Sequence, residues 1–155
     1  MAKTKSAGEE EFESGVQYLH NGYYGKALDK LKVAVELDKK NPLYVSYLGV
    51  LVGLAQKKHE EAAQLCHTAL QMNRHLVEGY LNLAQVYLKA GKKADAVEAL
   101  EVGLQYTKRD VRLVRELRKL GVRRPPVIPF LERKHFLNRN LGHLRHRVLK
   151  MLGKE

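Results

Sequence analysis

Apolar residues recur with helical spacing along the first 121 positions, in blocks separated by short turn sequences. In the block Leu81–Leu88 the apolar residues share one face of a helix, and a second such face covers residues 96–104. The turn sequence Ala90-Gly91 lies between them, and Asn21-Gly22 interrupts two helical patterns in the same way near the start of the chain. The pattern predicts pairs of antiparallel helices joined by short turns.

Small residues repeat along the chain at intervals of 34 or 35 positions. Three columns show this period: Ala27, Ala62 and Ala96; Ala34, Ala69 and Gly103; and Gly15, Gly49 and Ala84. Short side chains at a helix crossing leave room for a larger side chain of the facing helix, so these columns favour closely packed helix pairs. Stacking buries the apolar face that each pair leaves open. The predicted fold class is all-α, an α-solenoid of three helix-turn-helix repeats.

This pattern resembles the tetratricopeptide repeat family. One matching stretch lies in each repeat: GYYGKALDKLKVAVELD, EEAAQLCHTAL and YLNLAQVYLKAGKKADAVEAL. The implied organisation is a tail at 1–7 and an array at 8–121, with repeats at 8–41, 42–76 and 77–110 and a cap helix at 111–121. The cap helix continues the repeat register without a partner helix, and we expect it to close the array with a polar outer surface.

The resemblance also implies a binding surface, because the first helix of each repeat lines the concave side of a stacked array. The predicted peptide groove consists of Phe12, Val16, Leu19, Tyr47, Val50, Leu54, Leu81, Asn82, Gln85 and Lys89. Its apolar centre suits an extended peptide with aliphatic or aromatic side chains, and its polar members would bond to the peptide backbone or to acidic groups. The alternative for any one of these residues is packing against a neighbouring helix.

Some members of the family bind the C-terminal carboxylate of a chaperone through a clamp of lysine and asparagine residues. The asparagine positions of the first two repeats read Glu13 and Tyr47 in this sequence, and only Asn82 fits. One asparagine does not make a clamp, so we do not expect that specialisation here.

The positive charge of the chain is concentrated in its last third. Residues 1–107 hold 13 basic and 13 acidic residues, whereas residues 108–155 hold 15 basic and 4 acidic residues, which accounts for the whole net charge of +11. The predicted basic patch comprises Arg112, Arg115, Lys119, Arg139, Arg145, Arg147 and Lys150. Such a patch favours an acidic partner.

Two different parts make up the C-terminal segment. Residues 122–136 include the sequence RRPPVIPF, whose prolines exclude a helix and favour an extended linker. Residues 137–155 carry a one-sided apolar stripe opposite a basic face, which predicts an amphipathic helix. Three interpretations stay open: the segment packs on the array, PPVIPF occupies a groove of its own or a neighbouring copy, or the basic helix binds an acidic surface.

No combination of residues in the sequence suggests catalysis. The single cysteine, Cys66, excludes a disulfide framework and falls on an apolar column of the repeat, where we expect a core residue. His143 and His146 lie one helical turn apart, with His135 as a distant third, but a solvated basic face explains them more simply. We expect no enzymatic activity, no cofactor, no metal site and no small-molecule substrate.

The N-terminal sequence MAKTKSAGEEEFES has no apolar stretch of the secretory type, and no apolar run reaches the roughly 20 residues that span a bilayer. A soluble, cytoplasmic protein is expected. The predicted function is a non-catalytic adaptor or scaffold that binds a peptide or partner protein, with a homo-oligomer as one form of that interaction. The alternative is a charge-driven tether whose basic C-terminal segment binds an acidic membrane surface, nucleic acid or an acidic protein.

Overall fold

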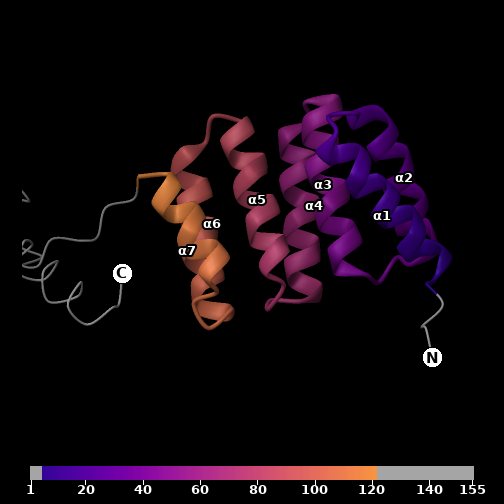
Figure 1. Ribbon diagram of the computed structural model, residues 1–155. Coiled ribbons are helices and arrows are strands. Elements are labelled where there is room, and N and C mark those ends of the chain that lie inside the picture. Colours follow the sequence, from indigo (N-terminus) through magenta and orange to yellow (C-terminus); the bar gives the residue numbers. More distant parts are fainter. Residues whose placement is uncertain (1–4, 122–155) are drawn as a thin grey trace, which may run out of the picture. The chain divides into compact units, whose positions relative to one another are not determined.

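The structure, a computed structural model, describes residues 5–121 (Figure 1). Within these residues the chain forms seven α-helices and no strand, which confirms the predicted all-α repeat fold. The predictions for residues 122–155 lie outside the described residues. They include the linker, the last helix and four members of the basic patch: Arg139, Arg145, Arg147 and Lys150.

Six of the helices form three antiparallel pairs, and the seventh has no partner helix within residues 5–121. The helices are Ala7–His20 (α1), Tyr24–Leu37 (α2), Pro42–Gln56 (α3), His59–Met72 (α4), Val77–Lys89 (α5), Lys93–Tyr106 (α6) and Val111–Lys119 (α7). Figure 1 shows them following one another in chain order, from α1 and α2 at one end of the array to α6 and α7 at the other. Each pair is joined by a turn of two or three residues.

The odd-numbered helices form an inner row. Helix α5 packs between α3 and α7, and α2 and α4 each pack against the first helix of the next pair as well as against their own partner. We call the surface formed by the exposed and half-buried side chains of α1, α3, α5 and α7 the odd-helix face. The even-numbered helices cover the opposite side of that row.

The small-residue columns lie where the two helices of a pair cross. A β-carbon added at Gly49 would lie 2.8 Å from the carbonyl oxygen of Ala62 and 2.9 Å from Sγ of Cys66, closer than packed carbons approach. The alanines of the neighbouring column, Ala27, Ala62 and Ala96, are fully buried. The close approach of α3 and α4 therefore depends on a residue without a side chain at position 49.

The turns between paired helices share one backbone feature. The residue two positions before each even-numbered helix has a positive φ, which is 78° at Gly22, 58° at Lys57 and 75° at Gly91. Glycine adopts this left-handed conformation without strain, whereas other residues do so at a cost. The two turns with glycine are predicted by the sequences Asn21-Gly22 and Ala90-Gly91, and in the third turn a lysine, Lys57, adopts this conformation.

Candidate functional site

Eight of the ten predicted groove residues have side chains that are half-buried or exposed in the array. They are Phe12, Val16 and Leu19 of α1, Tyr47 and Leu54 of α3, and Leu81, Gln85 and Lys89 of α5. The other two, Val50 and Asn82, are 1% and 6% exposed. The odd-helix face therefore offers a strip of accessible apolar side chains with polar residues towards its C-terminal end.

The two buried residues hold the inner helices together. The side-chain amide of Asn82 donates to Oγ of Ser46 at 3.0 Å, and this hydroxyl donates to the carbonyl oxygen of Leu43 at 2.9 Å. Val50 lies in the same core. For these two residues the structure shows packing between helices, so they are not part of the surface that we propose for binding below.

Aromatic contacts connect α1 with α3 at the N-terminal end of the face. The Phe12 ring stacks on Tyr44 with centroids 4.7 Å apart and meets Tyr47 edge-on at 5.2 Å. Burial raises the pKa of the Tyr47 phenol, and the nearby carboxylate of Glu78 acts in the same direction. Tyr47 therefore presents an uncharged hydroxyl on a largely apolar surface.

A hollow opens on the face between α5 and α7. Its volume is about 310 Å³, and the lining residues are Leu81, Ala84, Gln85, Leu88, Leu100, Glu116 and Leu120. Leu88 is 40% exposed, which is high for a leucine in the middle of a repeat array. The hollow can take one apolar side chain, with Gln85 and Glu116 as polar groups at its edge.

Ion pairs neutralise much of the basic patch that the structure describes. Arg112 pairs with Glu78 and with Asp110, and these two carboxylates raise its pKa above the usual value. Lys119 pairs with a glutamate one turn earlier, at 2.6 Å. Of the three patch members that the structure describes, Arg115 alone has no ion pair within residues 5–121. The C-terminal end of the odd-helix face is therefore less cationic than its sequence indicates.

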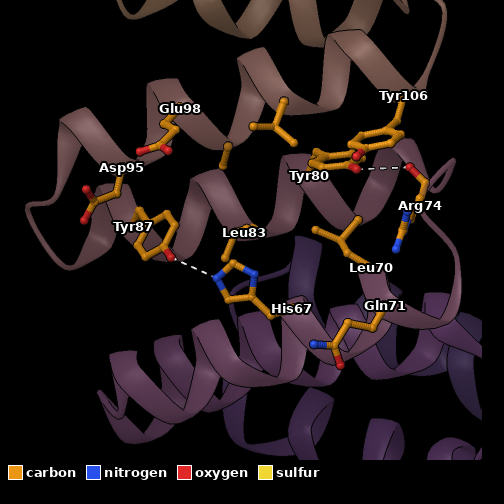
Figure 2. A pocket seen from close by; sticks show the side chains of 12 residues that line it. His67, Leu70, Gln71, Arg74, Tyr80, Leu83, Tyr87, Asp95, Glu98 and Tyr106 are labelled. Carbon is orange, nitrogen blue, oxygen red and sulfur yellow. Dashed lines mark hydrogen bonds between the residues drawn. The ribbon is translucent and has the colours of Figure 1, made fainter.

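A second hollow lies on the other side of the array, between α4 and α6 (Figure 2). We call it the even-helix hollow. Its volume is about 540 Å³, and it is lined by His67, Leu70, Gln71, Arg74, Tyr80, Leu83, Tyr87, Asp95, Glu98, Ala99, Val102 and Tyr106. This hollow was not predicted from the sequence. A comparison of equivalent positions in the repeats gives an indication of it, because Ala99 lies where the preceding repeat has the larger Leu65.

No group of metal ligands or reactive nucleophile is found in residues 5–121. The described side chains include no cluster of three or more histidine, cysteine or acidic residues that could hold a metal ion. Cys66 is fully buried, which confirms the prediction of a core residue, and burial raises the pKa of its thiol to about 12. None of the helices in this part of the chain is long and apolar enough to cross a membrane.

Comparison with known structures identifies the fold. The chain is 23% identical to the first TPR domain of Spaghetti (RPAP3) bound to the HSP90 peptide SRMEEVD, with a TM-score of 0.60 over 74% of this chain and 92% of that chain. It is 19% identical to the Sgt2 TPR domain from Aspergillus fumigatus, with a TM-score of 0.64 over 76% of this chain and 78% of that chain. For the second TPR domain of human RPAP3, in complex with the HSP70 peptide SGPTIEEVD, the identity is 21% and the TM-score 0.57, over 73% and 93% of the two chains.

Sequence comparison gives a match over part of the chain. A comparison with curated protein sequences gave no match. The family profile described as tetratricopeptide repeat matches residues 53–120, which run from the end of α3 to the end of the cap helix. The helical array of this chain therefore has the fold of tetratricopeptide repeat domains, and residues 53–120 match the profile of that family.

Proposed function

We propose that this protein is a non-catalytic adaptor that binds an extended peptide of a partner protein on its odd-helix face. The observation that carries the proposal is the accessible apolar strip from Tyr47 through Leu81 to Leu88, which ends in the hollow between α5 and α7. A large apolar side chain inserted there would be removed from water, which contributes about 1.5–3 kcal/mol. Similarity to domains whose structures contain bound peptides supports this kind of function.

The ligand that we propose differs from the peptides in those two complexes, which both end in EEVD. The Asn82 amide is bonded to Ser46 inside the array, so it does not reach a peptide carboxylate. The equivalent positions in the first two repeats are Glu13 and Tyr47, and Glu13 would repel an acidic peptide terminus. An internal peptide segment with aliphatic or aromatic side chains suits this face better. Gln85 and Lys89 would supply hydrogen bonds to its backbone.

Two exposed apolar residues of equal accessibility allow a matched test. Leu88 on α5 is 40% exposed and lies in the proposed site, whereas Val33 on α2 is 41% exposed and lies outside it. Peptides selected from a random display library on the full chain would be synthesised, and their Kd measured for the wild type, Leu88→Glu and Val33→Glu. We expect Leu88→Glu to weaken binding about tenfold and Val33→Glu to leave it unchanged. Equal loss in both variants, or in neither, would contradict the proposal.

The concentration of charge in residues 108–155 favours a second candidate, the charge-driven tether. Binding by exposed charges weakens steeply with added salt because the Debye length shortens, whereas docking of apolar side chains does not. If Tyr47→Glu left partner binding intact while deletion of residues 122–155 abolished it, the tether would replace the adaptor as the function. Light scattering of the full chain at low and high salt would show whether the partner is a second copy.

A further inference from the structure

The even-helix hollow has an apolar floor built from three helices. Leu70 of α4, Leu83 of α5 and Val102 of α6 line it together with the small Ala99. In the preceding repeat the position of Ala99 is held by Leu65, which packs against the core. Ala99 therefore leaves more space in the hollow than a leucine would, because its side chain has three fewer carbons. Its volume of about 540 Å³ falls within the usual range of ligand sites, about 300–1,000 Å³.

The two ends of the hollow differ in charge. Asp95 and Glu98 lie at one end beside Tyr87, whose hydroxyl is 3.0 Å from Nε2 of His67 (Figure 2). At the other end the guanidinium of Arg74 lies over the ring of Tyr106, 6.0 Å from its centroid. The lining is thus anionic at one end and cationic at the other, with the apolar floor between them.

The carboxylates at the anionic end have no cationic partner within residues 5–121. Neither Asp95 nor Glu98 takes part in an ion pair there. Lys92, which precedes α6, pairs with Glu60 at 3.3 Å instead. The face of the Tyr87 ring lies near the same end and would attract a cation. A positively charged group of a ligand would therefore complement the two carboxylates at this end of the hollow.

We propose that the even-helix hollow is a second binding site, which takes a basic peptide segment of a partner protein. An arginine or lysine of the segment lies against Asp95 and Glu98, and an aliphatic or aromatic residue a few positions away covers the apolar floor. The cationic end, with Arg74 and Tyr106, excludes a second basic residue and fixes the direction of the peptide. This site is on the opposite side of the inner helix row from the odd-helix face and does not depend on the function proposed for that face.

The length of the hollow sets the length of the segment. Asp95 and Tyr106 are eleven residues apart on α6, which corresponds to about 16 Å along a helix axis. An extended peptide rises about 3.3 Å per residue, so about five residues fill this distance. A suitable probe is the acetylated and amidated pentapeptide Arg-Ala-Leu-Ala-Phe, with Glu-Ala-Leu-Ala-Phe as its charge-reversed control.

Calorimetric titration of the full chain with the two peptides tests the site. We expect the arginine peptide to bind about tenfold more tightly than the glutamate peptide. Ala99→Leu should reduce its affinity about tenfold, because the leucine fills the space that the peptide would occupy. The variant should fold, since leucine occupies the equivalent place in the preceding repeat, and its melting temperature should be at least that of the wild type.

Single charge changes supply a matched control that does not alter packing. Glu98→Gln should weaken binding of the arginine peptide about threefold, whereas Glu101→Gln, an exposed residue of α6 outside the hollow, should have no effect. If Ala99→Leu does not fold, the double variant Asp95→Asn/Glu98→Gln takes its place. Equal affinity for the two peptides, no binding of either, or unchanged binding by Ala99→Leu would overturn the proposal.

Discussion

Lys57 has a left-handed backbone conformation at the place where the first and third repeats have glycine. For a residue with a side chain this conformation costs roughly 1–2 kcal/mol, which a glycine would avoid. A glycine has greater freedom in the unfolded chain, and this offsets about 0.5–1 kcal/mol of the stabilisation. We therefore predict that Lys57→Gly raises the free energy of unfolding by about 0.5 kcal/mol, measured by urea denaturation. The reverse change at the equivalent position, Gly91→Lys, should lower it by about 1 kcal/mol. A lower unfolding midpoint for Lys57→Gly would show that the side chain makes contacts that outweigh the strain.

Cys66 shows how burial makes stability depend on pH. Its folded-state pKa of about 12 lies above the ordinary thiol value of about 8.5, so the unfolded chain loses its proton first. The contribution of the buried neutral thiol is thus fully present below about pH 8.5 and is lost as pH rises towards 12. We predict that unfolding free energy falls more steeply between pH 8.5 and pH 11 in the wild type than in Cys66→Ala. Parallel curves for the two proteins would contradict a buried neutral thiol.

At the scale of helices, the Ser46–Asn82 hydrogen bond fixes α3 against α5. Removing Ser46 leaves the buried Asn82 amide without its partner, which costs about 1–3 kcal/mol. Removing Asn82 loses only the hydrogen bond, because the Ser46 hydroxyl still donates to Leu43, and removing both leaves no unpaired amide. We predict that Ser46→Ala and Asn82→Ala each destabilise the protein, and that the double variant loses less than the sum of the two. Strictly additive losses in urea unfolding would mean that the two side chains do not interact.

The same pair of helices shows what could be predicted from the sequence. The turns at Asn21-Gly22 and Ala90-Gly91 and the core position of Cys66 follow from local pattern and repeat period, and the structure confirms them. The burial of Val50 could not be predicted, because α3 is enclosed by α2, α4 and α5 and has apolar residues on most of its surface. Helical periodicity then no longer separates an exposed face from a packed one. The burial of Asn82 depends on its hydrogen bond to Ser46 of another helix, which sequence spacing does not reveal. The even-helix hollow could not be predicted either, because it depends on the sizes of side chains that three different helices bring together, Ala99 among them.

At the scale of the whole array, the position of a helix determines how many other helices are destabilised when its core packing is weakened. Helix α7 packs against α5 and α6 at the end of the described part, whereas α3 packs against helices on both sides. Leu113 of α7 and Leu51 of α3 are both fully buried, so they make a matched pair. We predict that Leu113→Ala speeds hydrogen exchange mainly in α6 and α7, and that Leu51→Ala speeds it throughout the array, each at a cost of about 2–5 kcal/mol. The same exchange pattern in both variants would contradict an array stabilised by nearest-neighbour contacts.

The odd-helix face is the surface that we propose for the binding of an extended apolar peptide. The most direct measurement is an NMR titration of the isotope-labelled full chain with a peptide selected by display, following the amide signals of every residue. We expect the largest shifts on the residues around Tyr47, Leu81, Gln85 and Leu88, and we expect added salt to change them little. Shifts confined to residues 122–155 and abolished by salt would contradict it and identify the basic segment as the binding element.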